Sequence, residues 1–203
     1  LFAVTFFGER LGSPFNPVHL DFLGRPVAPY YERTQPEHYA DAAPRGAAKS
    51  TIGSFIEPVH EACYGLEAYS VIMSTTYPLA ENMVSDIHNV FKDRETYAEL
   101  HEVYGPFLVQ GTKTDFVVKV PNQLPRGTRF KPFSFGGTIR GTKHEKDRPT
   151  VVRGDDTEHP EKVRSGQQRE KTDSFMTKDV MKAGDKRTRY IWRGTILHAD
   201  SLL

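Results

Sequence analysis

The residues best suited to chemistry in this chain form a short loop of small side chains that ends in a lysine and two hydroxyls. The loop consists of Pro44, Arg45, Gly46, Ala47, Ala48, Lys49, Ser50 and Thr51, and a helix-like run follows from residue 52 to residue 60. Small residues let consecutive backbone N–H groups curl around phosphate oxygens, a lysine reaches the outer phosphates, and a hydroxyl at the next position binds Mg²⁺. Lys49 and Ser50 stand at the last two positions. The pattern therefore predicts a phosphate-binding loop.

The loop departs from the usual glycine pattern of phosphate loops at two positions. Where that pattern places glycine, this chain has Ala43 and Ala48. The alternative is a loop that leads into an ordinary amphipathic helix, and the loop residues alone support both interpretations about equally.

A second group of chemically useful residues follows a short β-branched run near residue 150. Thr150, Val151 and Val152 read as a strand, and Asp155, Asp156 and Glu158 come at its end. Open α/β sheets bind ligands at the carboxyl ends of their strands, so these acids are placed to hold a metal and activate water. An acidic turn after an edge strand is the alternative. Together with Lys49 and Ser50, the acids favour a metal-dependent nucleotide site.

Composition limits what the chain can be. It has 203 residues, with 27 Lys and Arg against 26 Asp and Glu, which suits one α/β domain with a substantial core. A formal charge of +1 means that any DNA contact must come from a local patch. The single Cys63 excludes an internal disulfide and a cysteine zinc site. We expect a soluble, intracellular chain without a membrane span, and, since it begins without Met, a fragment.

Patterns along the chain predict alternating strands and helices. Residues 1–40, rich in proline and aromatic residues, predict an irregular lead-in with at most one helix, and residues 41–203 predict the domain core. Within that core, helices are expected over 50–64, 79–91, 95–104 and 160–182, strands over 68–74, 150–154 and 189–194, and a hairpin over 117–120 and 128–135. This alternation predicts a mostly parallel sheet.

Taken together, five segments resemble those of tailed-bacteriophage terminase large subunits. They occur in the same order, at residues 43–51, 138–144, 148–158, 163–169 and 194–203, and the resemblance covers roughly residue 40 to the end. Such proteins are DNA-packaging motors with an N-terminal ATPase domain and a C-terminal nuclease domain. The resemblance implies an ASCE-type P-loop NTPase, a three-layer α/β sandwich with a mostly parallel central sheet. The nuclease domain is expected to be absent from this fragment.

The same resemblance implies a role for each matching residue. Lys49 is expected to neutralise β/γ-phosphate charge, Ser50 and Asp155 to hold Mg²⁺, and Thr51 to touch the α-phosphate of ATP. Arg45 is placed to sense the γ-phosphate, and Thr195 matches a coupling motif that reports phosphate status. The general base is Asp156, which stands where the family usually has glutamate, or else Glu158. Arg140, flanked by glycines, is the first candidate for an arginine finger supplied in trans, ahead of Arg126, Arg129 and Arg148.

The resemblance also implies partners. They are double-stranded DNA, further copies of the chain in a homo-oligomeric ring, a portal protein and a small terminase subunit, all in the host cytoplasm. Two other functions stay open at this point, a helicase-like or regulatory P-loop NTPase and a non-catalytic nucleotide-binding scaffold. Candidates for the adenine pocket are Phe15, Pro17, His19, Tyr30 and Tyr31 in the lead-in.

Overall fold

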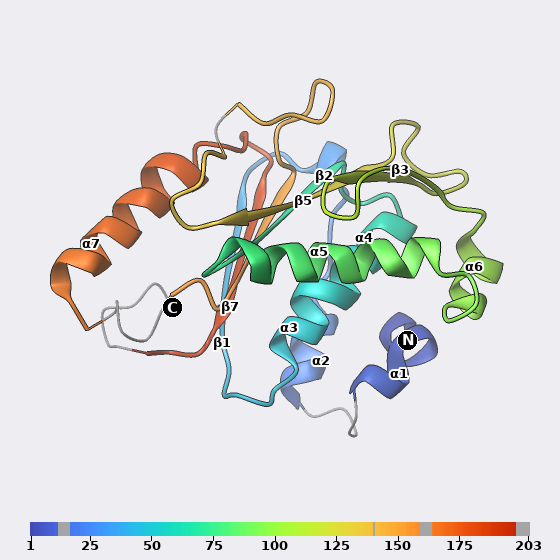
Figure 1. Ribbon diagram of the computed structural model, residues 1–203, viewed down its shortest axis with the longest axis horizontal. Helices are drawn as coiled ribbons and strands as arrows, with labels where there is room; N and C mark the ends of the chain where they lie inside the picture. Colours follow the sequence, from blue (N-terminus) through green and yellow to red (C-terminus); the bar gives the residue numbers. More distant parts are fainter. Residues whose placement is uncertain (12–16, 140, 159–163, 198–203) are drawn as a thin grey trace.

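A seven-stranded, mostly parallel sheet forms the centre of the computed structural model, which describes residues 1–11, 17–139, 141–158 and 164–197 (Figure 1). The strands lie in the order β1-β7-β6-β2-β5-β4-β3. The first five in this order run parallel, and β4 and β3 add an antiparallel hairpin at one edge. The strand bounds are β1 Glu37–Ala42, β2 Tyr69–Ser74, β3 Leu108–Gly111, β4 Phe116–Lys119, β5 Thr128–Ser134, β6 Val151–Asp155 and β7 Arg189–Gly194.

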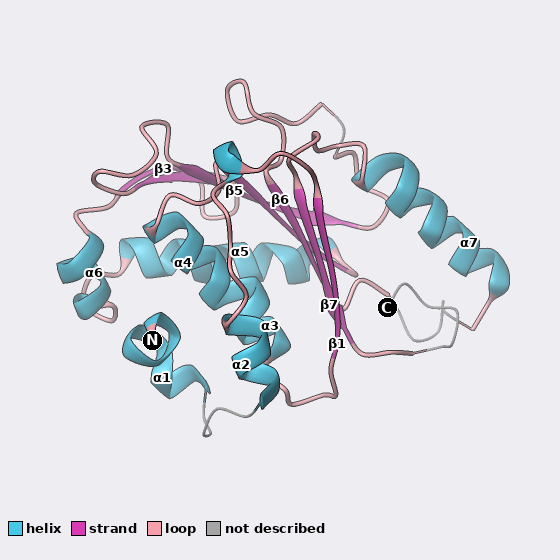
Figure 2. Cartoon of the chain, turned by 180° about the vertical axis from the view of Figure 1, so that it is seen from behind, coloured by secondary structure: helices cyan, strands magenta, loops and turns pink. Residues whose placement is uncertain are grey.

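Helices cover both faces of the sheet, which gives three layers. Figure 2 shows α1 to α6 on one face and α7 on the other. The helical bounds are α1 Phe2–Leu11, α2 Pro17–Leu23, η1 Tyr30–Glu32, α3 Lys49–Thr51, η2 Ile52–Ile56, α4 Glu57–Cys63, α5 Tyr77–Lys92, α6 Ala98–Tyr104, α7 Gly166–Phe175 and η3 Met176–Val180. Within the described ranges, no helix combines the length and the apolar character that a membrane crossing requires.

The central strand β2 separates two hydrophobic cores. All six of its residues are buried, as expected of a parallel strand covered on both faces. Ile72 faces the larger core, with residues of η2, α4 and α5, while Val71 and Met73 face the smaller one, with Met176 and Val180 of η3. This alternation along one strand fixes which side of the sheet each helix covers.

Most of the predicted elements are present. The strands near 68–74, 150–154 and 189–194, the hairpin of β4 and β5, and the helices near 50–64, 79–91 and 95–104 are confirmed. The last helix begins only at Gly166, and residues 160–163 of its predicted range lie outside the described residues. The prediction of at most one helix before residue 40 is wrong, because α1 and α2 both precede it.

The carboxyl ends of three parallel strands meet at one edge of the sheet and position the predicted site. Ala42 of β1 pairs with Gly194 of β7, and Asp155 of β6 pairs with Arg193 of β7. Strand β7 therefore lies between the strand that leads into the phosphate loop and the strand that ends in the acids. The loop, the acids and Thr195 all follow at this edge.

A layer of buried charges lies between α4 and the sheet. Glu61 of α4 pairs with the guanidinium groups of Arg153 on β6 and Arg189 on β7. Arg189 also contacts Glu67 at 2.8 Å, and Glu67 pairs with Arg33. Burial alone would raise the pKa of Glu61, but the two arginines outweigh it and hold that pKa below its usual range. These ions are stable inside the protein because each has a partner.

Candidate phosphate-binding site

The backbone of the predicted phosphate loop has the left-handed turns that such a loop requires. Gly46 has φ of 82°, and Ala48, where the usual pattern has glycine, has φ of 50°. An alanine in this conformation is strained, because its Cβ crowds the backbone. The chain thus keeps the glycine-like backbone without the glycine.

Behind the loop, a single continuous helix runs from Lys49 to Cys63. Segments α3, η2 and α4 follow one another without a break, since Ile52 and Glu57 at the junctions have helical φ and ψ values. The first bond of this helix joins the Ile52 N–H to the Ala48 carbonyl at 2.9 Å. The N–H groups of the first helical residues have no partner within a helix, so those of Lys49, Ser50 and Thr51 are oriented to receive an anion.

Lys49 is buried and lies at the centre of the site. Its ammonium donates to the carbonyl oxygens of Ala43 at 2.8 Å and Pro44 at 2.9 Å. It also lies 3.3 Å from the Thr195 hydroxyl. The lysine and the predicted coupling residue are therefore in direct contact across the β1–β7 pair.

Ser50 and Asp155, the predicted magnesium ligands, also lie together. The Ser50 hydroxyl lies near the Asp155 carboxylate, and Asp155 is 3% exposed. Burial raises the pKa of Asp155 to about 6; the Ser50 hydroxyl and the charges of Lys49 and Arg193 oppose this, and Asp156 adds to it. The Asp155 Oδ1 atom has no hydrogen-bond partner among the described residues. A buried carboxylate oxygen of this kind is suited to a cation.

Asp156 is turned towards β7. Its φ is 41°, its N–H donates to the Arg193 carbonyl at 2.9 Å, and its Oδ1 accepts from the Thr195 N–H at 3.2 Å. The side chain that we predict to orient water therefore holds the start of the segment after β7. Glu158 is half-buried three residues beyond the end of β6.

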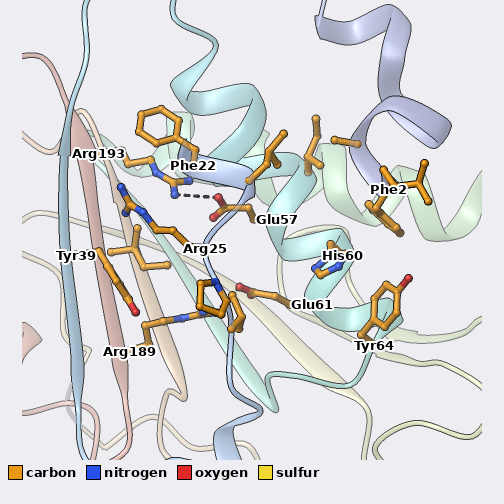
Figure 3. A pocket seen from close by; sticks show the side chains of 17 residues that line it. Phe2, Phe22, Arg25, Tyr39, Glu57, His60, Glu61, Tyr64, Arg189 and Arg193 are labelled. Carbon is orange, nitrogen blue, oxygen red and sulfur yellow. Dashed lines mark hydrogen bonds and ion pairs between the residues drawn. The ribbon is translucent and has the colours of Figure 1, made fainter. Parts of the chain in front are cut away.

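Arg193 is a residue of this site that the sequence analysis missed. Its guanidinium bonds Asp41 of β1 at 2.8 Å and Glu57 of α4 at 2.9 Å, the latter drawn as a dashed line in Figure 3. A Cβ on Gly53 would collide with its Nη1, so the helix after the loop packs directly on it. Arg193 thus joins the loop strand, the loop helix and β7. A charged residue inside the otherwise apolar run from Tyr190 was the signal available in the sequence.

The remaining predicted residues are the other loop residues, the first candidate for the arginine finger, and the lower-ranked candidates for that finger. Arg45 is exposed and Ala47 buried within the loop, and Thr51 is half-buried on the first turn of the helix. Arg140 lies outside the described residues, so its predicted role as a finger stays a prediction. The lower-ranked finger candidates each have a partner away from the loop: Arg126 pairs with Glu145, Arg129 with Asp115, and Arg148 donates to the Lys182 and Gly184 carbonyls.

The lead-in tyrosines do not form an adenine pocket beside the loop. Tyr30 donates to Asp185 at 2.5 Å and Tyr31 to Asp147 at 2.6 Å. Both acids precede strands, at the amino edge of the sheet, opposite Lys49. His19 is buried, and Phe15 lies outside the described residues. The prediction for Tyr30 and Tyr31 is wrong because the chain after α2 runs along the sheet to its far edge before β1 begins.

The donors at the site fit Mg²⁺ better than a metal held by protein alone. No cluster of three or more His, Cys, Asp or Glu side chains that could hold a metal occurs in the described part of the chain. Magnesium in nucleotide sites is usually held by one or two protein oxygens, with water and phosphate filling the other positions. Ser50 and Asp155 offer that set.

Comparison with known proteins finds no matching family model and no matching curated protein. Among solved structures, the large terminase of a thermophilic bacteriophage has a TM-score of 0.53 and 13% identity, over 89% of this chain and 39% of that one. The large terminase ATPase domain of Thermus phage P74-26 gives 0.47 and 18%, over 89% of this chain and 70% of that one. A mutant of that domain gives 0.48 and 18%, over 91% and 72%.

The similarity to the first of these, the large terminase of the thermophilic bacteriophage, shows the fold. It confirms the predicted P-loop α/β architecture and, at the level of fold, the resemblance to phage large terminases drawn from the five sequence segments. The chain spans 39% of the length of that terminase.

Proposed function

We propose that this chain is the ATPase domain of a viral terminase, which couples ATP hydrolysis to the movement of double-stranded DNA into a procapsid. One observation carries the proposal. In a terminase-like fold, the loop lysine, the Ser50–Asp155 pair and Thr195 converge at the carboxyl ends of β1, β6 and β7. A loop that merely led into a helix would not need this convergence.

Lys49 is the group that responds to nucleotide. Its ammonium is held by two neutral carbonyl oxygens. Charged phosphate oxygens are stronger acceptors, so the β/γ-phosphates of ATP draw the ammonium away from these carbonyls. The contact between Lys49 and the Thr195 hydroxyl then changes as well, which gives the phosphate state a direct route to β7.

Ser50 and Asp155 would hold Mg²⁺, with the ionised carboxylate as the stronger ligand. The bound ion would neutralise charge on the phosphoryl group in transfer. Because the pKa of Asp155 is about 6, this carboxylate is ready to bind a cation at pH 7 and loses that ability as the pH falls below 6. Burial of the Asp155 side chain keeps bulk water away from its Oδ1 atom, which has no partner among the described residues.

The catalytic carboxylate is Asp156 or Glu158. Asp156 is exposed at the strand end, and it would have to release the Thr195 N–H to reach a water. That exchange would link water activation to the segment after β7. We keep Asp156 first and Glu158 second.

The experiment that tests the function is phosphate release from ATP with Mg²⁺. Lys49→Ala is expected to lower kcat/KM at least about a hundredfold, because it removes charge stabilisation from the transition state. Lys113→Ala, at an exposed loop lysine, is the matched control and should keep wild-type turnover. Wild-type ATP binding and turnover in a folded Lys49→Ala protein would remove the assignment.

The two carboxylates are ranked in the same assay. Asp156→Asn is expected to leave nucleotide bound and to slow hydrolysis, since a water-orienting group acts chiefly in the transition state. If Glu158→Gln abolishes turnover and Asp156→Asn does not, the ranking is reversed.

Assembly is tested by mixing subunits. The proposed partners are double-stranded DNA, further copies in a ring, a portal protein and a small terminase subunit, in the host cytoplasm. If Arg140 is supplied in trans, mixtures of Arg140→Ala and Lys49→Ala chains should recover part of the activity that each lacks alone. Turnover that neither DNA nor assembly changes would favour a regulatory NTPase, and nucleotide binding without turnover would favour a scaffold.

A further inference from the structure

Positive charge is concentrated in one stretch of this chain. Residues 108–146 contain eight Lys and Arg against two Asp and Glu, whereas the whole chain has 27 against 26. The stretch is therefore strongly basic, and the rest of the chain carries more acids than bases. A basic region within a nearly neutral chain is the pattern expected where a protein contacts a polyanion.

The fold gathers this stretch on one face of the sheet, opposite α5. Phe116 of β4 and Phe130 of β5 point into the larger core, which α5 covers. Successive side chains of a strand point to opposite faces, so the residues between and beside them lie on the other face. On β4 and β5 these residues are Val117, Lys119, Arg129 and Lys131. The register pairs Val117 with Arg129, which joins the two rows into one surface.

This part of the sheet is open to solvent. Helix α7 reaches β5 only near its carboxyl end, where the ring of Phe175 stacks on that of Phe133. Figure 2 shows α7 at the end of the sheet away from β3, with no described helix over the outer face of the hairpin. The side chains of Arg129 and Lys131 are 22% and 33% exposed. A large ligand can therefore reach them.

Most of the cations at this face lack an acidic partner. Asp115 contacts Arg129 at 2.8 Å and Lys131 at 3.4 Å, so one carboxylate serves two cations. The loop after β5 adds Lys143, whose carbonyl accepts from the Arg129 guanidinium at 2.5 Å. The ammonium groups of Lys119 and Lys143 have no ion-pair partner among the described residues. The face thus has an excess of positive charge.

Protection of a sheet edge does not explain these lysines. Lysine on an edge strand prevents that strand from pairing with another chain. The edge strand of this hairpin is β3, whose residues 108–111 include no charged side chain. The lysines lie instead on β4, on β5 and in the following loop. Their position suits the binding of a ligand across the face.

We propose that the basic face, defined by Lys119, Arg129, Lys131 and Lys143, binds the phosphate backbone of double-stranded DNA. Each ammonium group that neutralises a phosphate releases condensed counterions, which is the main source of affinity in such contacts. The choice of DNA as the partner rests on the proposed function, while the location of the surface rests on its charge and exposure.

The side chains between the cations favour a duplex over other polyanions. They are Leu108, Gln110 and Val117, so the described face exposes no aromatic ring on which an unpaired base could stack. An acidic protein is the other alternative. Lysine is depleted at the centre of protein–protein interfaces, and here lysines dominate the surface.

Fluorescence anisotropy of a labelled duplex, with the chain alone and without nucleotide, tests the proposal. We expect a dissociation constant on the order of 10 µM at about 50 mM salt, for a duplex of about 20 base pairs. The combined change Lys119→Gln, Lys131→Gln and Lys143→Gln should weaken binding at least about tenfold. It should also reduce the slope of log affinity against log salt by about 2–3.

A control variant of equal charge separates the face from net charge. Lys171, Lys182 and Lys186 are exposed lysines of α7 and of the segment after η3, away from the hairpin. Their combined change to Gln removes the same charge and should keep wild-type affinity and slope. Equal losses in the two variants would overturn the assignment of the face.

Two further results would overturn the proposal. The first is no saturable binding of the duplex by the wild-type chain. The second is equally tight binding of polyglutamate with the same number of charges, which would point to an acidic protein as the partner. An NMR titration with the duplex should shift residues 117–119, 129–131 and 143. A shift map confined to other residues would overturn the location even if the triple variant does not fold.

The outcome is separable from that of the proposed function. The variant of the basic face retains Lys49 and Asp155, so its phosphate release without DNA should equal that of the wild type. A chain that binds DNA through this face but releases no phosphate would remove the ATPase assignment and keep this inference. Phosphate release without DNA binding would do the reverse.

Discussion

Two regions of this molecule bury charged side chains, and they differ in how completely those charges are paired. Beneath α4, Arg189 contacts Glu61 and Glu67, and Arg33 and Arg153 complete the layer. At the carboxyl edge, Lys49 is held only by neutral oxygens, and Asp155 has an oxygen without a partner among the described residues. The first region is paired ion to ion, and the second is not.

This difference distinguishes buried charges that stabilise the fold from buried charges that are available to bind a ligand. In the layer every buried ion already faces an ion of opposite charge, even where single atoms such as Glu61 Oε2 and Glu67 Oε2 lack a hydrogen-bond partner among the described residues. Lys49 and Asp155 can each gain a stronger partner from a nucleotide and its metal. Of the four described non-glycine residues with positive φ, Ala48 and Asp156 lie at the carboxyl edge, Asn122 and Glu145 lie in other loops, and none lies in the paired layer. Removing one charge should therefore lower the free energy of unfolding in the paired layer and raise it at the carboxyl edge.

Breaking the paired layer should have the largest effect. Arg189→Met leaves Glu61 and Glu67 short of a cation, and we expect a loss of about 3–5 kcal/mol in the free energy of unfolding. Arg126→Met is the matched control, since Arg126 and Glu145 form an exposed pair at 2.8 Å and the expected loss is below about 1 kcal/mol. Urea unfolding of both variants gives the comparison, and equal losses would contradict it.

Neutralising the unpaired region should instead stabilise the chain. Burial raises the pKa of Asp155 from 3.8 to about 6, so its carboxylate costs folded-state stability as the pH rises from 4 to 6, and the cost stays constant above 6. Asp155→Asn should then raise the free energy of unfolding by about 1–3 kcal/mol at pH 7.5, without nucleotide or Mg²⁺.

The gain from Asp155→Asn should vanish at about pH 3, well below both pKa values, where the wild-type carboxyl is protonated in the folded and in the unfolded state. Urea unfolding at pH 7.5 and at about pH 3 checks this. A gain of the same size at both values would mean that packing, and not ionisation, separates the two proteins.

The smallest expected effect concerns strain in the loop. Ala48→Gly relieves the left-handed alanine and should stabilise the chain by up to about 1 kcal/mol, even though glycine gains more freedom on unfolding. Ala47→Gly, at a neighbouring position without positive φ, should destabilise by about 0.5–1 kcal/mol. Thermal unfolding of the pair measures both signs. Destabilisation by both substitutions would show that the strain at Ala48 is negligible.

Strong local sequence patterns were sufficient to predict much of the fold. The apolar run that became β2 and the helical stripe that became α5 were readable because each buries a continuous set of side chains. Strand β1 was missed because it lies at the sheet edge, where most of its side chains are half-buried or exposed and Asp41 is its one buried residue.

The predicted site depended on residue chemistry more than on spacing. Lys49, Ser50 and Asp155 were recognised by type, and the structure brings them together, although their catalytic roles remain predictions. Arg193 could not be assigned, because its partners Asp41 and Glu57 come from segments far away in the sequence. Only the strand order reveals that β7 lies next to β1.

That strand order has a mechanical consequence. Strand β7 is the middle member of three, so β1, which leads into the phosphate loop, and β6, which ends in Asp155, cannot move apart or together without acting on it. Its carboxyl end is tied to the loop through Ala43 and to the acids through Asp156. The residues after Gly194 are thus attached both to the phosphate loop and to the acids. A shift of the phosphate loop relative to the acids would therefore move the segment after Gly194 in one direction.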